Sequence, residues 1–128
     1  MNAMAKTGLL LFAHGARDPR WAQPFEQVAA AVRAARPALA VRLAFLEFMA
    51  PDIRSAAGEL ARDGCVQVDV LPLFLGAGGH VRKDLPPLLD ELRAAHAGVT
   101  FMLHPAVGEA PSLIAAMAEI ALSLPPKP

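Results

Sequence analysis

Two histidines and one glutamate are the residues of this sequence whose types could bind a metal ion together. His14 and His80 each follow an apolar segment typical of a strand, and Glu47 ends another such segment. Two neutral imidazoles and one carboxylate suit a divalent transition metal and leave coordination positions open, whereas structural zinc sites usually have four protein ligands. If the three side chains meet, they form a site that holds an ion weakly enough to exchange it.

Each of these residues also has a purely structural interpretation. An isolated histidine more often hydrogen-bonds a neighbouring loop than binds a metal, and Glu47 could be a salt-bridge partner or a solvated strand end. Two other histidines are weaker candidates: His96 stands near the end of a predicted helix, where a cation suits the helix dipole, and His104 ends the last predicted strand. The metal-site hypothesis therefore requires His14, Glu47 and His80 to share one cleft.

Alternating strand and helix patterns predict how these residues are positioned. Short apolar runs typical of buried strands alternate with apolar residues at helical spacing. The predicted strands cover 9–13, 41–48, 66–75 and 99–103, and the predicted helices begin near Asp18, Pro51, Asp84 and Pro111. This alternation predicts one three-layer α/β domain with a four-stranded parallel sheet and helices on both faces. We expect the domain to cover 8–124, between a loose lead over 1–7 and a tail over 125–128.

The cleft of such a sheet lies beyond the carboxyl ends of its strands, where the strand order reverses. With an assumed order of 2-1-3-4, His14, Glu47 and His80 converge there from three separate segments. The segment after the third strand is longer than the usual connection of about 2–6 residues, which is typical of binding loops. Its glycines, among them Gly78 and Gly79, permit positive φ and leave room for a bulky ligand.

Composition narrows the classes of partner. The 128 residues are 55% hydrophobic, and twelve basic and twelve acidic residues cancel. With no excess of basic residues, the composition does not indicate binding to nucleic acid or to an anionic membrane. The apolar run over 8–13 is too short to span a bilayer. The single cysteine, Cys65, excludes an internal disulfide and fits a reducing cytoplasm.

Four stretches of the sequence resemble one known family. They read LLLFAHGARDPRW, FLEFMAPDI, LPLFLGAGGHVRKDLP and PAVGEAP, and they run in the order typical of the small class II tetrapyrrole chelatases, the CbiX-type sirohydrochlorin cobaltochelatases and ferrochelatases. The resemblance covers about 8–122. The first block usually reads His-Gly-Ser-Arg, and Ala16 here replaces the serine, which removes one hydroxyl group.

The resemblance implies an activity, a fold and an assembly. It implies ATP-independent insertion of Co²⁺, or of Fe²⁺ or Ni²⁺, into sirohydrochlorin or a similar reduced tetrapyrrole, with no permanently bound cofactor. The chain resembles the half-sized form of these chelatase-like, flavodoxin-like proteins, which implies a homodimer. The metal-contacting histidines of the family correspond to His14 and His80, and an acidic partner corresponds to Glu47. Any of the three could accept a pyrrole proton.

Basic residues near the same cleft suit the carboxylates of a tetrapyrrole, because arginine pairs with carboxylates through two hydrogen bonds. The candidates, each of which could equally be a solvated surface charge, are Arg17, Arg20, Arg54, Arg82 and Lys83. Apolar Leu75, Val81 and Leu85 could contact the ring face, although core packing explains them equally well. Asp84 is expected to cap a helix.

Two other functions fit parts of the pattern. A metal carrier, or a tetrapyrrole-binding protein without insertion activity, would need the same open two-histidine site. A histidine phosphatase would also place His-Gly after its first strand, but those enzymes normally have arginine before the histidine, where this sequence has Ala13. The glycine cluster lacks the spacing of a phosphate-binding loop.

Overall fold

The structure, a computed structural model, describes residues 5–76 and 79–126, with side chains left undescribed over 79–82. It contains four strands, four α-helices and two 3-10 helices. The strands are β1 (Lys6–Ala13), β2 (Ala40–Phe45), β3 (Cys65–Pro72) and β4 (Thr100–Leu103). The helices are η1 (Pro19–Ala22), α1 (Gln23–Ala35), α2 (Ile53–Arg62), α3 (Gly79–Ala95), η2 (Val107–Glu109) and α4 (Pro111–Leu122).

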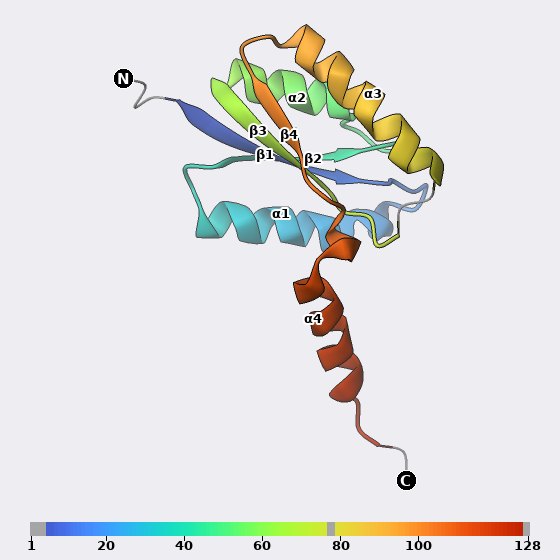
Figure 1. Ribbon diagram of the computed structural model, residues 1–128. Coiled ribbons are helices and arrows are strands. Elements are labelled where there is room, and N and C mark those ends of the chain that lie inside the picture. The colour runs from blue at the N-terminus through green and yellow to red at the C-terminus, as the bar shows by residue number, and fades with distance from the viewer. Residues whose placement is uncertain (1–4, 77–78, 127–128) are drawn as a thin grey trace.

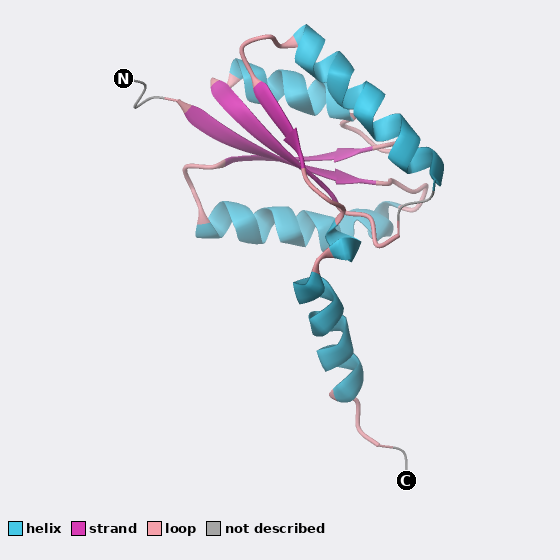
Figure 2. Ribbon diagram, viewed as in Figure 1, coloured by secondary structure: helices cyan, strands magenta, loops and turns pink. Residues whose placement is uncertain are grey.

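The four strands form one parallel sheet in the order β2-β1-β3-β4, as predicted. The chain crosses from β1 to β2 in one direction and from β2 to β3 and β4 in the other. Right-handed crossovers therefore place α1 on one face of the sheet and both α2 and α3 on the opposite face. Figure 1 shows these three layers, and Figure 2 shows the sheet enclosed between the helices.

Strand β1 joins the two halves of the core because its side chains alternate between the faces of the sheet. Leu10 and Phe12 pack against the α2 and α3 side, and Leu11 and Ala13 pack against the α1 side. All four are essentially without exposed surface. This double burial explains why the sequence of β1 is a continuous apolar run and shows no alternation.

Several predicted boundaries differ from the observed ones; β3, for example, ends at Pro72 and not at Leu75. β1 begins at Lys6, so the end of the expected lead over 1–7 belongs to the sheet. β2 ends at Phe45, which places Glu47 in the following turn. α3 begins at Gly79 and not near Asp84, so the prolines expected in its first turn lie inside the helix.

Because α3 starts earlier than predicted, several candidate site residues belong to a helix and not to a loop. Pro86 and Pro87 each lack the amide hydrogen that a helix interior uses, and for that reason the sequence favours a helix that starts just before them. The structure continues the helix five residues further toward the amino terminus. His80, Arg82 and Lys83 are therefore residues of the first turns of α3 and not of a loop.

Helix α2 begins with a side-chain cap. Asp52 has extended backbone angles, and its Oδ1 accepts a hydrogen bond from the Ser55 amide at 2.8 Å. This hydrogen bond lowers the pKa of the Asp52 carboxyl below its ordinary value. The cap thus stabilises the fold above the pKa of the unfolded chain and is lost as the pH falls through the lower pKa of the folded state.

We expect Asp52→Ala to reduce the free energy of unfolding by about 1 kcal/mol at pH 7, because one amide at the start of α2 loses its acceptor. Asp52→Asn retains an acceptor that does not ionise. Its stability, relative to the wild type, should therefore rise as the pH is lowered below about 4. Urea unfolding at pH 7 and pH 3 measures both effects. Equal midpoints for Asp52→Ala and the wild type at pH 7 would show that the cap contributes nothing.

Helix α4 departs from the layered arrangement. It starts at Pro111, as predicted, but it projects away from the sheet, and none of its residues is buried (Figure 1). In the described part of the chain, no helix is long and apolar enough to cross a bilayer.

Candidate functional site

The segments after β1 and β2 are joined by backbone hydrogen bonds beyond the ends of the strands. The Leu46 amide donates to the Ala13 carbonyl at 2.9 Å, and the Glu47 amide donates to the His14 carbonyl at 3.1 Å. Gly15 follows with φ +93°, and a Cβ atom at Gly15 would lie 1.8 Å from the Glu47 carbonyl oxygen. Only glycine permits this approach, which holds His14 beside Glu47.

The side chains of His14 and Glu47 face one another at the carboxyl edge of the sheet. His14 Nε2 lies 3.8 Å from Glu47 Oε1, and the two side chains are 45% and 51% exposed. The His14 ring also meets the ring of Phe74 edge to face, with centroids 5.6 Å apart. The imidazole is thus oriented by an aromatic neighbour and remains accessible to a ligand.

A pocket of ≈ 280 Å³ opens beside this pair. It lies between the ends of β1 and β2, the segment after β3, and the first half of α3. Its lining residues are Phe12, His14, Leu46, Glu47, Phe74, Asp84, Leu85 and Leu88. Two of the three predicted metal-site residues therefore share one pocket, at the edge of the sheet where the strand order predicts a ligand.

The third predicted metal-site residue, His80, lies in the first turn of α3, and its side chain is outside the described set. Among the side chains that the structure does describe, no group of three histidine, cysteine, aspartate or glutamate residues could hold a metal. The backbone nevertheless brings the start of α3 to the edge that carries His14, as Figure 1 shows. A metal ligand set of His14, Glu47 and His80 stays a prediction.

Two of the predicted arginines, Arg17 and Arg54, already have partners. The Arg17 guanidinium lies 4.9 Å from the centre of the Phe48 ring. Arg54 pairs with Glu91 of α3 at 2.9 Å. Each could bind a substrate carboxylate only in competition with its present partner.

Arg20 is engaged locally. It donates to Asp18 through both its backbone and its side chain, which lowers the pKa of the Asp18 carboxyl. Among the other predicted substrate-binding residues, Lys83 is exposed on α3, Gly79 begins that helix, and Gly78 and the Arg82 side chain are outside the described set. The roles of all these residues in substrate binding stay predictions.

Sequence reasoning missed Phe48, whereas it named Leu75 as a candidate contact for the ring face. Phe48 and Leu75 are 58% and 67% exposed, and Phe48 has a positive φ of 67° that turns the chain after Glu47. They follow Glu47 and Phe74, which line the pocket, and large exposed apolar side chains suit a flat apolar ligand. The sequence signal for Phe48 was its position next to Glu47. Asp84, predicted to cap α3, instead lines the pocket from the second turn of that helix.

His104, the weaker candidate, belongs to a different part of the molecule. Its Nε2 lies 2.9 Å from Asp69 Oδ1, on the face of the sheet that carries α1. Phe12 and the α3 residues that line the pocket lie on the other face. The structure thus separates His104 from the His14–Glu47 pair, which agrees with its lower rank.

Comparisons with known proteins agree on a family. The CbiX family model matches residues 8–123. The sirohydrochlorin cobaltochelatase of Sulfurisphaera tokodaii is 34% identical over 101 residues, which are 79% of each chain.

Two solved structures share the fold. The CbiX protein of Marinobacter aquaeolei, described as a putative cobalamin biosynthesis protein, is 34% identical with a TM-score of 0.79, and the match covers 91% of this chain and 94% of that one. A CbiX described as the terminal enzyme for biosynthesis of siroheme in denitrifying bacteria is also 34% identical, with a TM-score of 0.68, over 95% of this chain but only 50% of that one. Since the family model covers nearly the whole sequence and the fold agrees over the same span, the chain belongs to the CbiX family.

Proposed function

We propose that this CbiX-family chelatase inserts a divalent metal ion into sirohydrochlorin or a similar reduced tetrapyrrole, without ATP. Co²⁺ is the first candidate, with Fe²⁺ and Ni²⁺ as alternatives, and the product would serve synthesis of a cobalamin-type or siroheme-type cofactor. The observation that supports this most directly is the accessible His14–Glu47 pair at 3.8 Å in the pocket at the sheet edge. The curated relative that carries the name cobaltochelatase supports the reaction class.

The chemistry requires one metal ion to enter the ring and two pyrrole protons to leave it. A neutral His14 imidazole would replace water on the incoming ion and hold it beside the ring. Glu47 would share the ion or accept a proton as a pyrrole nitrogen becomes a ligand. A protonated imidazole cannot bind a cation, so protons and the metal ion compete for this nitrogen.

The size of the pocket restricts how the substrate binds. At ≈ 280 Å³ it is at the lower limit of small-molecule sites, too small to enclose a tetrapyrrole. We therefore propose that the macrocycle lies across the pocket mouth, with one face against the exposed side chains of Phe48 and Leu75. Its carboxylates would be within reach of Arg17 and Lys83, while Arg54 would first have to leave Glu91.

The proposal extends to the oligomeric state, the cofactor requirement and the cellular compartment of the enzyme. We propose that it works as a homodimer and holds no resident cofactor, the metal ion being a substrate. Cys65 is buried, and burial raises the pKa of its thiol, which keeps the group protonated and unreactive. An unreactive single thiol suits the reducing cytoplasm, where we place the protein.

The experiment that tests this function mixes the purified protein with sirohydrochlorin and Co²⁺, and follows the visible spectrum. We expect conversion well above the spontaneous rate, without ATP. Fe²⁺ and Ni²⁺ in the same assay rank the metals. Tight binding of Co²⁺ without accelerated conversion would identify a metal carrier and overturn the chelatase proposal.

A further inference from the structure

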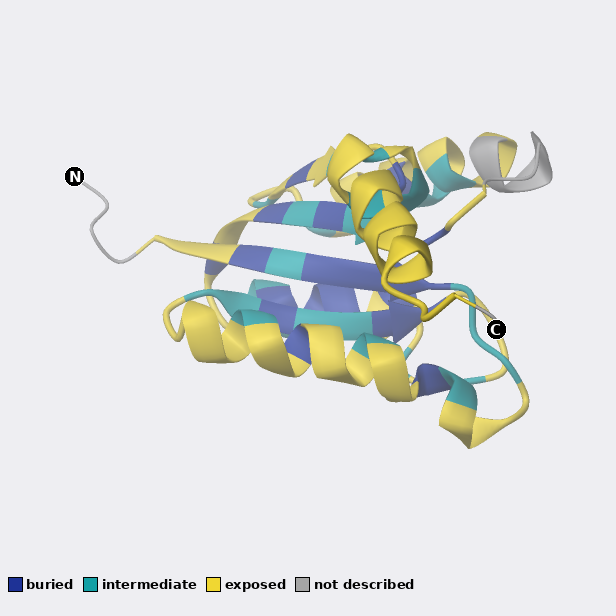
Figure 3. Ribbon diagram, turned by 90° about the horizontal axis from the view of Figure 1, so that it is seen from below, coloured by how far each residue is buried: buried dark blue, intermediate teal, exposed yellow. Residues whose placement is uncertain are grey.

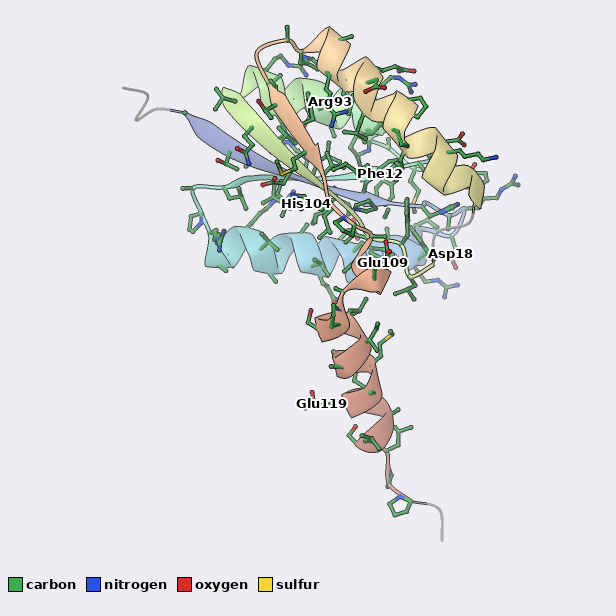
Figure 4. All side chains as sticks on the ribbon, in the orientation of Figure 1. Phe12, Asp18, Arg93, His104, Glu109 and Glu119 are labelled. Atoms are coloured by element: carbon green, nitrogen blue, oxygen red, sulfur yellow. The ribbon has the colours of Figure 1, made fainter. Side chains whose placement is uncertain are left out.

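Helix α4 is a short apolar helix without a cover. Its twelve residues contain two polar side chains, Ser112 and Glu119, and none of the twelve is buried. Figure 3 shows α4 exposed along its length, and Figure 4 places Glu119 well away from the sheet. An isolated helix of this length is marginal in water, and most helices gain their stability by packing an apolar face. The apolar surface of α4 therefore needs a partner.

An uncovered part of the sheet lies at the base of α4. Leu9, Asp69 and Met102 are register partners across β1, β3 and β4, so their side chains share the face that carries α1. Helix α1 packs mainly beside β2 and leaves this part of the face open. We name this surface the β3–β4 groove. It has a volume of ≈ 590 Å³ and is lined by Leu9, Asp69, Leu71, His104, Pro105, Ala106, Val107, Glu109, Ala110 and Pro111.

The chemistry of the groove suits an apolar helix face. Most of its lining is apolar, and Met102 beside it is 48% exposed. Of its three polar side chains, Asp69 and His104 already bond to each other at 2.9 Å, and Glu109 is exposed. A helix that covers the pair would leave this hydrogen bond intact, so the two groups would not be buried without a partner for each other.

The connection before α4 directs the helix away from its own groove. Ala110, which precedes Pro111, has extended angles of φ −77° and ψ 125°, as a residue before proline prefers. Gly108 is anchored to the segment after β3: its amide donates to the Phe74 carbonyl at 2.9 Å, and a Cβ atom there would lie 1.8 Å from the Leu75 carbonyl oxygen. This restrained connection leaves little freedom to fold α4 back onto the sheet.

We infer that the β3–β4 groove is covered by α4 of a second copy of this chain, and that the two copies exchange these helices reciprocally. The match to the siroheme-biosynthesis CbiX covers 95% of this chain but only 50% of that one. Two copies of this chain therefore contain about as many residues as one copy of that protein. Reciprocal exchange gives a closed assembly in which both grooves and both helices are covered. The inference rests on the homodimer in the proposed function but not on the chelatase activity.

Paired α4 variants test this surface. Met117 lies on the apolar side of α4, and Ala116 lies on the narrow polar side with Ser112 and Glu119. Met117→Lys should raise the dissociation constant of the dimer by about 30-fold or more, as for a central interface residue, whereas the matched Ala116→Lys should change it little. Met102→Lys, at the groove, should act like Met117→Lys. Light scattering during size-exclusion chromatography measures the mass, expected for the wild type to be twice the 13.5 kDa of one chain.

A crosslink identifies what covers the groove. Ile114→Cys, labelled with a photoreactive maleimide, should crosslink to β3–β4 residues of another chain and yield a species of doubled mass on a denaturing gel. Crosslinks to the groove within one chain would show that α4 folds back, and would overturn the inference. A wild-type monomer would overturn both this inference and the homodimer. A dimer insensitive to Met117→Lys and Met102→Lys would overturn the exchange alone and leave the homodimer standing.

Discussion

His14→Ala should lower the rate of cobalt insertion into sirohydrochlorin by about 100-fold or more, to near the spontaneous rate. The imidazole is 45% exposed, lies 3.8 Å from Glu47 and lines the pocket, so its loss removes a predicted metal ligand and a predicted proton acceptor. The same variant should weaken Co²⁺ binding in a titration without sirohydrochlorin. The fold should remain stable, because the His14 side chain is half exposed and its anchoring hydrogen bonds come from the backbone.

His96→Ala is the matched control for this experiment. His96 follows α3, and its ring contacts Phe101, whose side chain belongs to the core on the α2 and α3 side. Its removal should leave both insertion and metal binding unchanged. If His14→Ala retains the excess rate over the spontaneous reaction, the proposed mechanism is wrong. Loss of insertion with intact Co²⁺ binding would instead assign His14 to proton transfer.

Gly15→Ala should reduce both stability and activity. Alanine at φ +93° costs roughly 1–2 kcal/mol, and its Cβ would lie 1.8 Å from the Glu47 carbonyl oxygen. The segments after β1 and β2 must separate to relieve this contact, at the expense of the hydrogen bond from the Glu47 amide to His14. We expect a loss of about 3 kcal/mol or more in the free energy of unfolding, and slower metal insertion because Glu47 moves away from His14.

Gly64→Ala distinguishes the cost of the left-handed backbone conformation from the cost of the contact with Glu47. Gly64 has the same φ of +93°, but nothing lies within 4 Å of a Cβ atom there. Gly64→Ala should therefore reduce the free energy of unfolding only by the cost of the left-handed conformation, about 1–2 kcal/mol. Its activity per folded molecule should not change. Urea unfolding and the insertion assay on both variants measure the difference. Equal effects of the two substitutions would show that the contact between Gly15 and Glu47 does not position the site.

Local patterns in the sequence were sufficient for the architecture. The apolar run of β1, the helical spacing after each strand and the helix start near Asp18 predict a parallel α/β sheet, and the assumed order 2-1-3-4 is confirmed. The resemblance to CbiX-type chelatases, stated from four motifs, is confirmed by the family model. These features could be predicted because strand burial and turn chemistry depend on residues close together in the sequence.

Positions that depend on contacts between distant segments could not be predicted. The sequence placed Glu47 at a strand end, but the backbone hydrogen bond to His14 and the close approach of Gly15 decided where its carboxylate lies. The tandem prolines favoured a helix beginning near Asp84, whereas α3 begins five residues earlier and brings Asp84 into the pocket.

By itself, the sequence determined the alternation of strands and helices, the resemblance to the CbiX family and the candidate residues His14, Glu47 and His80, because these follow from motifs and from the periodicity of single segments. The strand order had to be assumed, and the structure confirmed it. The tertiary structure decided that His14 and Glu47 share a pocket, that His104 pairs with Asp69 on the other face, and that α4 leaves the sheet. The reason is physical: periodicity shows that a helix has an apolar side, but only the placement of the other elements shows which surface is left for that side to cover.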